Sequence, residues 1–323
     1  MLVSSTPLRV SFLGGGTDFP WFFEEHGGAV LSTTINKFIY ISALPSYDGV
    51  TTYLKYSKTE SVSDFSRIEH PIFRSVLSSF SLPPMDWSVM ADVPAGNGLA
   101  SSSAFTVGLV NAAAYVTGQS ASPLELAQKA IHVELDLLNE PIGIQDQLAS
   151  AFGGLNLFQF SGNRKVSVSS IISQDDGFPF GMVLVKVGPR DRRAGIFTRE
   201  QRKFAEENRE VFDQLKVLRD LTLEASVSLR DDIGRLPEYV RRGWELKVKT
   251  NPHAISTEIN EIINTGYSAG AEAGKLVGAG GSGFVLFLAQ KDKTEKLIEL
   301  FWKKGTIAFE VKSINQGSKV TSV

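Results

Sequence analysis

The chain has 323 residues, with 33 lysine and arginine against 35 aspartate and glutamate, a formal net charge of -2 and no cysteine. This composition excludes a disordered or coiled-coil chain and gives no electrostatic reason to expect nucleic acid or an anionic membrane as partner. The absence of cysteine excludes disulfides and iron–sulfur clusters and favours a reducing cytoplasm. We therefore expect a cytoplasmic protein, without a membrane span, that acts on a small molecule. The oligomeric state is left open.

The first ninety residues are predicted to form mostly strands. Apolar or β-branched runs between turn signals fall at Leu8–Leu13, Phe38–Leu44, Thr51–Tyr56 and Trp87–Val93. From Ser101 an apolar period of three to four residues predicts a buried helix that ends at Gly118. A second helix is predicted to begin at Ser122-Pro123, because Glu125 stands where it closes a capping box.

The second half of the chain mixes strands with longer helices. Strand-like runs stand at Leu155–Phe160, Met182–Val187 and Phe284–Ala289, a periodic charged stretch covers Thr198–Val248, and an amphipathic helix is predicted around Lys291–Lys303. Since an ordinary domain has roughly 100–200 residues, we expect two domains. We place them at residues 1–177 and 178–323, with the boundary near Gly177.

Three segments are dense in glycine: Phe12–Asp18, Pro94–Ser103 and Gly278–Gly283. None is a P-loop, because Gly274-Lys275 is followed by Leu276 where that motif needs serine or threonine. The third segment has the spacing G-x-G-x-x-G, but a strand follows it where a dinucleotide fold needs a helix. A tight turn between helix and strand explains that segment equally well.

The middle segment favours a phosphate site. Gly96-Asn97-Gly98 leads directly into Ser101-Ser102-Ser103 at a predicted helix N-terminus, where free N–H groups, the helix dipole and hydroxyls face one place. An Asn-Gly hairpin followed by a serine cap is an equal alternative on local sequence alone.

Two acidic residues strengthen the phosphate interpretation. Glu134 lies within the apolar stripe of the helix that begins at Pro123, and a carboxylate there needs a partner. Mg²⁺ is one such partner, since it favours one or two carboxylates together with nucleotide oxygens. Twelve residues later, Asp146 could present a second carboxylate to the same pocket. The alternatives are a structural ion pair for Glu134 and a helix cap for Asp146.

In this order the motifs resemble those of the GHMP kinases, the superfamily of galacto-, homoserine, mevalonate and heptose kinases. The resemblance covers nearly the whole chain. Its first motif is similar to Pro7–Asp18, its second to Pro94–Ser103 and its third to Gly278–Phe284. Within the superfamily, the Gly-Gly-Gly-Thr-Asp form and Gln145-Asp146-Gln147 are most similar to D-glycero-D-manno-heptose 7-phosphate kinases.

The resemblance implies an α+β fold of two domains, ribosomal-protein-like at the N-terminus and ferredoxin-like at the C-terminus, with ATP and a sugar phosphate meeting between them. It implies that Asp146 is the base and that Arg9 stabilises the transferring phosphoryl group. Ser102 and Glu134 would hold Mg²⁺. ATP would contact Pro94, Gly96, Gly98, Leu99, Ala100, Ser101, Ser102 and Ser103, and the acceptor would contact Gly15, Gly16, Thr17, Asp18, Gly280 and Gly281.

Two positions depart from the family pattern. Ser282 stands where a third glycine is expected, and Ile144 where the heptose kinases would have lysine. A basic run of Lys186, Arg190, Arg192 and Arg193 could bind a phosphate already on the acceptor, or be a solvated loop. We expect an ATP-dependent kinase for the anomeric hydroxyl of a heptose 7-phosphate. A GHMP kinase for another sugar or small alcohol and a non-catalytic ATP-binding homologue are the alternatives.

Overall fold

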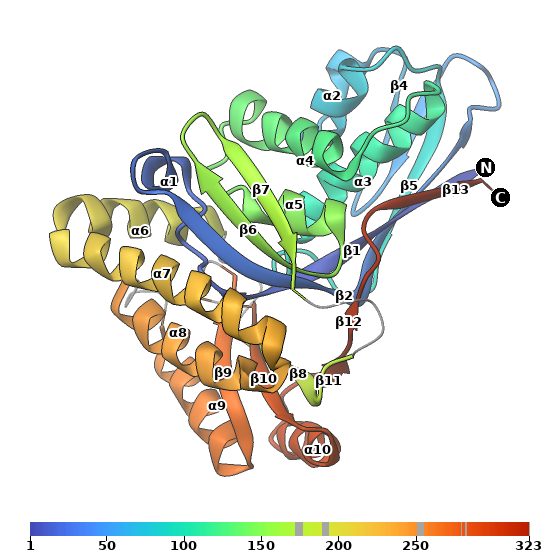
Figure 1. Ribbon diagram of the computed structural model, residues 1–323. Coiled ribbons are helices and arrows are strands. Elements are labelled where there is room, and N and C mark those ends of the chain that lie inside the picture. Colours follow the sequence, from blue (N-terminus) through green and yellow to red (C-terminus); the bar gives the residue numbers. More distant parts are fainter. Residues whose placement is uncertain (172–176, 189–193, 251–254, 279, 282, 323) are drawn as a thin grey trace.

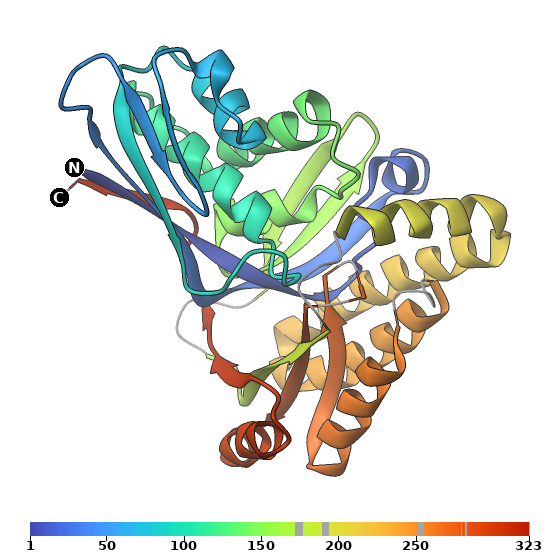
Figure 2. The same ribbon diagram turned by 180° about the vertical axis from the view of Figure 1, so that it is seen from behind.

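The computed structural model describes residues 1–171, 177–188, 194–250, 255–278, 280–281 and 283–322. Its described part holds two β-sheets, each covered by helices (Figure 1). Seen from behind, the two halves of the chain meet along β1 (Leu2–Leu13), which runs across the middle of the molecule (Figure 2). The α+β class expected from the resemblance is confirmed.

The first sheet is built on β1 and its long antiparallel neighbour β2 (Gly28–Pro45). With β13 (Lys319–Ser322) at one edge, its strand order is β13-β1-β2-β5-β3-β4. The N-terminal half of β2 pairs with β6, which pairs with β7. The remaining bounds are β3 Thr52–Lys55, β4 Thr59–Val62, β5 Met85–Ala91, β6 Leu155–Ser161 and β7 Lys165–Ser170.

Helices of the N-terminal half pack against this sheet. The central one, α3 (Ser101–Val116), is buried at almost every position from Ser103 to Ala114, as its small apolar residues predict. Around it lie α1 Pro20–His26, α2 Pro71–Ser78, α4 Pro123–Ile131, α5 Gln145–Phe152 and the short η1 Phe65–Arg67. The capping box at Ser122 is confirmed, since Ser122 and Glu125 bond to one another's backbone N–H groups.

The second sheet has the order β11-β8-β10-β9 and is fully antiparallel. Its strands are β8 Phe180–Val187, β9 Ala271–Val277, β10 Gly283–Gln290 and β11 Ala308–Val311. The helices of this half are α6 Ala194–Glu207, α7 Arg209–Asp231, α8 Leu236–Thr250, α9 Thr257–Ser268 and α10 Thr294–Lys303, with short turns η3 Ile233–Arg235 and η5 Lys291–Lys293. The helical stretch predicted from Thr198 to Val248 is thus three helices.

The end of the chain returns to the first sheet. Strand β12 (Ser313–Ile314) pairs with β2, and β13 (Lys319–Ser322) pairs with β1, so the two termini lie side by side (Figures 1 and 2). The division at residue 177 stays a prediction. None of the helices in the described ranges is long and apolar enough to cross a membrane.

Candidate functional site

The second and third glycine-rich segments touch each other where the two sheets meet. A methyl group added to Gly98 would lie 2.5 Å from the carbonyl oxygen of Val277, and one added to Gly278 would lie 2.6 Å from the α-carbon of Gly98. One added to Gly283 would lie 2.7 Å from the carbonyl oxygen of Asn97. Glycine is therefore required at these positions for close backbone contact between the two halves of the chain.

The middle segment leads into the N-terminus of α3, as predicted. Ala100 precedes the helix with a left-handed φ of 64°, and the side chain of Ser102 in the first turn is exposed. The segment connects β5 to a helix, so it is not the hairpin of the alternative interpretation. Free N–H groups at the first turn make this a place where phosphate oxygens can bind.

Arg9 connects this segment to Asp146. A register shift between Pro7 and Arg9 interrupts the ladder to β2, and the N–H of Arg9 donates instead to the carbonyl of Leu99 at 3.2 Å. Its guanidinium donates to the carbonyl of Gly98 at 2.8 Å, and to Asp146 Oδ1 from Nη2 at 2.6 Å and from Nε at 2.8 Å. With Arg9 only 4% exposed, one buried side chain fixes both the segment and the candidate base.

Glu134 lies in a π-helical segment, η2 (His132–Leu137), that directly follows α4. The sequence predicted an uninterrupted helix, but the N–H of Leu138 bonds to the carbonyl of Val133, five residues earlier. Such a bulge turns one side chain away from its regular place and is frequent at functional sites. Here it accompanies a glutamate that is 1% exposed.

The bonds of Glu134 fit a metal ligand. Its Oε1 accepts from the hydroxyl of Ser102 at 3.0 Å, and its Oε2 accepts from Gln147 Nε2 at 2.6 Å. Burial raises the pKa of Glu134 to about 7, since these neutral donors offset only part of the lost hydration. No basic residue in the described ranges pairs with it, so the ion-pair alternative has no partner there.

A divalent cation would supply the missing positive charge. The described residues contain no group of three or more histidine, cysteine, aspartate or glutamate side chains placed to hold a metal. A cation held by Ser102 and Glu134 would therefore need oxygens from a nucleotide, which is the coordination that Mg²⁺ favours.

The first glycine-rich segment forms a loop around Asp18. This side chain is 2% exposed, and it accepts from the N–H of Gly16 at 3.0 Å and from the N–H of Gln145 at 3.4 Å. A methyl group added to Gly143 would lie 1.8 Å from Asp18 Oδ2, so glycine there makes room for the carboxylate. Burial, together with the charge of Asp146, raises the pKa of Asp18.

Thr17 fastens this loop to the sheet. Its hydroxyl bonds to the carbonyls of Gly14 and Ala29 and accepts from the N–H of Ala29. It is fully buried, so its bonding capacity is used within the protein.

Two polar atoms near this loop were not singled out by the sequence. Ser11 Oγ and Gln145 Oε1 are buried and bond to no other described residue. Both residues border Gly15, because a methyl group there would lie 3.6 Å from Gln145 Nε2 and 3.7 Å from Ser11 Oγ. A bound polar molecule would satisfy them.

Several predicted residues are placed differently or lie outside the described ranges. Gly280 and Gly281 belong to the loop between β9 and β10, with φ of 122° and 74°. Arg190, Arg192, Arg193 and Ser282 lie outside the described residues. Ile144 is 1% exposed and packs in the apolar core.

Two lysines of the C-terminal half also reach this region, although no local sequence signal predicts them. Lys275 of β9 is 5% exposed, and its Nζ donates to the carbonyls of Ser11 and Phe12 at 2.6 and 2.9 Å. Lys247 of α8 donates from Nζ to the carbonyl of Gly278 at 2.7 Å.

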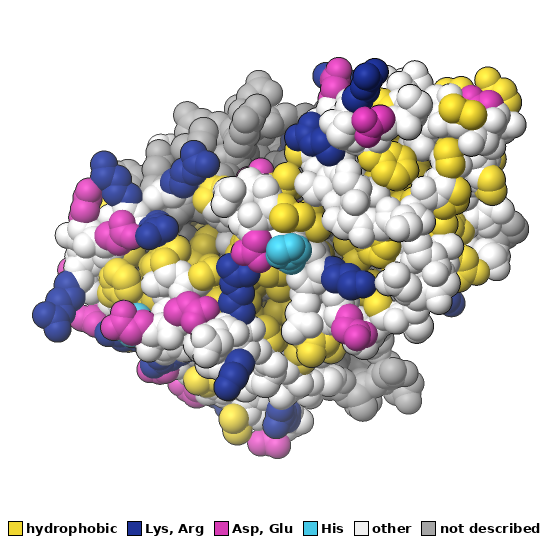
Figure 3. Space-filling model, turned by 90° about the horizontal axis from the view of Figure 1, so that it is seen from above, with side chains coloured by type: hydrophobic (Ala, Val, Ile, Leu, Met, Phe, Trp, Pro, Cys, Tyr) yellow, Lys and Arg dark blue, Asp and Glu magenta, His cyan; other side chains and the backbone are white. Residues whose placement is uncertain are grey.

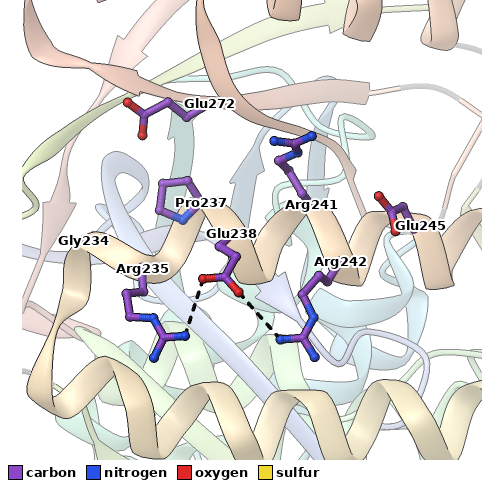
Figure 4. Close-up of a pocket in the computed structure, with 8 residues that line it drawn as sticks. All are labelled: Gly234, Arg235, Pro237, Glu238, Arg241, Arg242, Glu245 and Glu272. Carbon is purple, nitrogen blue, oxygen red and sulfur yellow. Dashed lines mark hydrogen bonds and ion pairs between the residues drawn. The ribbon is translucent and has the colours of Figure 1, made fainter.

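A separate open hollow of about 550 Å³ lies beside α8, between Gly234, Arg235, Pro237, Glu238, Arg241, Arg242, Glu245 and Glu272 (Figure 4). Its charges compensate one another, since Glu238 lies 3.5 Å from Arg235 and 3.9 Å from Arg242. The face of the molecule in Figure 3 likewise intersperses acidic and basic side chains.

Comparison with known proteins finds similar kinases. Residues 68–154 match the family model described as the GHMP kinases N terminal domain. The chain is 26% identical over 317 residues to the D-glycero-alpha-D-manno-heptose 7-phosphate kinase of Campylobacter jejuni, covering 93% of both chains. It is 22% identical to the galactokinase of Pyrococcus furiosus, covering 90% of both.

Solved structures share the whole fold. The structure of a D-glycero-D-manno-heptose 1-phosphate kinase from Bacteriodes thetaiotaomicron has a TM-score of 0.79 and 22% identity, and covers 100% of this chain and 99% of its own. The mevalonate kinase of Methanococcus jannaschii has a TM-score of 0.76 and 17% identity, with 98% of both chains covered. Residues 68–154 are thus similar to the GHMP kinase N-terminal domain, and the whole chain is similar to kinases of that superfamily. These similarities support an ATP-dependent phosphotransferase.

Proposed function

We propose that this kinase uses ATP and Mg²⁺ to phosphorylate the anomeric hydroxyl of a sugar, with a heptose 7-phosphate as the acceptor. The observation that carries the proposal is the double attachment of Arg9, which bonds to Gly98 in the phosphate segment and to Asp146 beside the acceptor loop. The donor site and the candidate base are thereby held together before any substrate binds.

The reaction follows from this arrangement. The acceptor oxygen forms a bond to the γ-phosphorus of ATP while the bond from that phosphorus to the bridging oxygen breaks, and ADP leaves with the electron pair. The hydroxyl proton passes to Asp146. Arg9 meets negative charge on the phosphoryl oxygens, because phosphoryl transfer depends chiefly on positioning and charge stabilisation.

Each remaining predicted residue has a place in this proposal. The helix start and its segment, from Pro94 to Ser103, would bind the phosphates of ATP, and Ser102 and Glu134 would hold Mg²⁺, which shields phosphate charge when bound. Gly15, Gly16 and Asp18 would contact the sugar, with Gly280 and Gly281 above it. Thr17 would act by shaping the loop. Arg193 stays a proposed ligand of the distal phosphate on sequence grounds.

The polar lining favours a sugar over a mainly apolar acceptor. Asp18, Ser11 Oγ and Gln145 Oε1 are buried close to Asp146 and can bond to several hydroxyl groups. A mevalonate-like alcohol would leave more of these groups unsatisfied, at a cost of about 1–3 kcal/mol each. The relatives include a heptose 7-phosphate kinase, which supports the phosphorylated acceptor. Use of ATP is consistent with the expected cytoplasmic location.

A panel of acceptors assayed with ATP and Mg²⁺ tests the proposal. We expect D-glycero-D-manno-heptose 7-phosphate to have the highest kcat/KM, ahead of the unphosphorylated heptose, galactose and mevalonate. Arg193→Ala should reduce the preference for the phosphorylated heptose over the neutral one, because each charge-assisted bond contributes about 1.5–3 kcal/mol. Preference for a neutral sugar would replace the heptose phosphate as acceptor, and ATP binding without turnover of any acceptor would favour the non-catalytic alternative.

A further inference from the structure

Lys247 brings a cation from the C-terminal half of the chain to the junction of the glycine-rich segments. It lies near the end of α8, is half-buried, and donates one hydrogen bond of 2.7 Å from Nζ to the carbonyl of Gly278. Gly278 is the residue that approaches Gly98 within backbone contact. A chain of direct contacts therefore runs from Lys247 through Gly278 and Gly98 to Arg9.

The packing of α8 fixes this position. One turn before Lys247, a methyl group added to Gly243 would lie 2.3 Å from Leu13 Cδ2, so the helix backbone rests directly on the end of β1. Residues four apart share a helix face, which turns Lys247 towards the loops that follow β1 and β9. Glu238 and Arg242 lie on other faces and line the separate hollow in Figure 4.

Three basic side chains, Arg9, Lys247 and Lys275, meet at this junction beside the carboxylates of Asp18 and Asp146. Among the described residues, Lys275 Nζ bonds only to the carbonyls of Ser11 and Phe12, and Arg9 makes its one ion pair with Asp146. Burial, and then the charge of Arg9, lowers the pKa of Lys247 to about 8, with Asp18 acting in the opposite direction. Burial, and then the charge of Lys247, lowers the pKa of Lys275. An anion placed between Arg9 and Lys247 would relieve this repulsion.

We infer that Lys247 and Arg9 together hold the phosphoryl group as it passes from ATP to the acceptor. The inference rests on the proposed function. An ammonium has three N–H donors and Gly278 takes one, so two remain for phosphoryl oxygens. During transfer, the bond from phosphorus to the bridging oxygen breaks, the bond to the acceptor oxygen forms, and the hydroxyl proton moves to Asp146. Throughout this step Lys247 stabilises the negative charge on the phosphoryl oxygens from the side of the C-terminal half.

The contacts favour this role over binding a phosphate already on the acceptor. Lys247 is linked to Gly98 of the phosphate segment through Gly278, whereas a phosphate at the far end of the sugar lies away from the reacting hydroxyl. The two roles give different results when acceptors with and without that phosphate are compared.

Lys247→Met, with Lys249→Met as matched control, tests the inference in the full chain. Lys249 is an exposed lysine on the same helix. We expect Lys247→Met to lower kcat by about 10²–10³, the usual cost of removing one preorganised charge-stabilising donor. The decrease should be equal for the heptose 7-phosphate and the neutral heptose, with little change in KM for ATP. Lys249→Met should match wild type.

A binding measurement separates the role of Lys247 from overall activity. ADP with aluminium fluoride and Mg²⁺ imitates the transferring phosphoryl group, and it should raise the melting temperature of wild type above the value with ADP alone. Lys247→Met should lose most of this additional stabilisation while keeping the response to ADP.

The pH profile supplies a further test. Wild-type kcat should fall above about pH 8 as Lys247 loses its proton. Arg9, Asp18 and Lys275 face the same region, and their charges contribute to the pKa of Lys247. Lys247→Arg should keep substantial activity and move this decline to higher pH, because arginine stays protonated. It also keeps the test valid if the methionine variant does not fold.

Each result decides the inference. Unchanged kcat in Lys247→Met, or full retention of the aluminium fluoride response, overturns it. A decrease confined to the phosphorylated acceptor also overturns it and assigns Lys247 to the acceptor phosphate. Failure of the proposed function looks different, since wild type itself would then show no turnover with any acceptor.

Discussion

Arg9 bonds to Asp146 through a single carboxylate oxygen. Both Nη2, at 2.6 Å, and Nε, at 2.8 Å, donate to Oδ1. Among the described residues Oδ2 receives no such bond, and the side chain is 25% exposed, so Oδ2 can face an acceptor hydroxyl. The same guanidinium donates to Gly98, which keeps the base in a fixed position relative to the phosphate segment.

Asp146→Asn should lower kcat by about 10²–10⁴, because asparagine keeps the shape and an oxygen for Arg9 but cannot accept the proton. ATP affinity, measured by calorimetry, should change little. Asp136→Asn is the matched control, since Asp136 also pairs with an arginine, Arg164, but on the surface. Near-normal turnover of Asp146→Asn would leave the residue only as the partner of Arg9, since it stands inside α5 and does not cap the helix.

Glu134→Gln should raise the Mg²⁺ concentration needed for half-maximal activity, because the metal would lose its carboxylate ligand. Ser102→Ala should act in the same direction more weakly, since it removes a neutral ligand that also bonds to Glu134. Titration of activity with Mg²⁺ at fixed ATP checks both. Unchanged Mg²⁺ dependence in both variants would remove these residues from the metal site.

The stability of Glu134→Gln should move in the opposite direction to its activity. A carboxyl whose pKa rises from 4.5 in the unfolded chain to about 7 in the folded one binds its proton more tightly when folded, so stability falls as pH rises through this interval. The loss above pH 7 is on the order of 3 kcal/mol. Without metal and nucleotide, Glu134→Gln should therefore melt above wild type at pH 8 and near it at pH 4.5. A lower melting temperature at pH 8 would instead indicate a structural ion pair.

Site residues that belong to a local sequence motif could be predicted from the sequence. Site residues that reach the site only through packing of distant segments could not. The glycines around Asn97 and the serines after them indicate a helix N-terminus from their neighbours alone. Glu134 stands out because an acid interrupts an apolar stripe. The π-helical turn that carries it has no signal in the local apolar pattern, which is that of an uninterrupted helix.

Lys247 and Lys275 are site residues that local sequence patterns do not predict. Both stand in segments whose local pattern predicts an ordinary helix and an ordinary strand. They reach the site because Gly243 lets α8 rest on Leu13 and because β9 passes behind β1, more than two hundred residues away in sequence. Their amino groups reach the site only once the two halves of the chain are in contact.

Asp18→Asn should raise KM for the acceptor and leave ATP affinity unchanged. Asparagine fits the space that Gly143 provides and can still accept from the N–H of Gly16, but it lacks the charge that strengthens bonds to sugar hydroxyls. We expect kcat/KM for the acceptor to fall about tenfold to a hundredfold, the effect of one charge-assisted bond. Thr17→Val, which loosens the loop without removing charge, should lower the melting temperature. If Asp18→Asn weakens ATP binding and spares the acceptor, Asp18 does not belong to the acceptor loop.

The contact between the two glycine-rich segments can be tested with a pair of neighbouring glycines. Gly96 and Gly98 have φ of 82° and 75°, so alanine at either position costs about 1–2 kcal/mol of backbone strain. They differ in their surroundings, because a methyl group at Gly96 meets nothing within 4 Å, while one at Gly98 would lie 2.5 Å from the Val277 carbonyl.

Gly98→Ala should therefore force the two segments apart and displace the carbonyl that Arg9 binds. Gly96→Ala should introduce the same backbone strain without a steric clash. We expect ATP to bind about tenfold or more weakly to Gly98→Ala than to Gly96→Ala, corresponding to at least about 1.4 kcal/mol. Calorimetric titration with ATP and Mg²⁺ measures this difference directly. Equal affinities in the two variants would mean that contact with Val277 and Gly278 does not shape the nucleotide site, and the junction between the halves would then serve the acceptor alone.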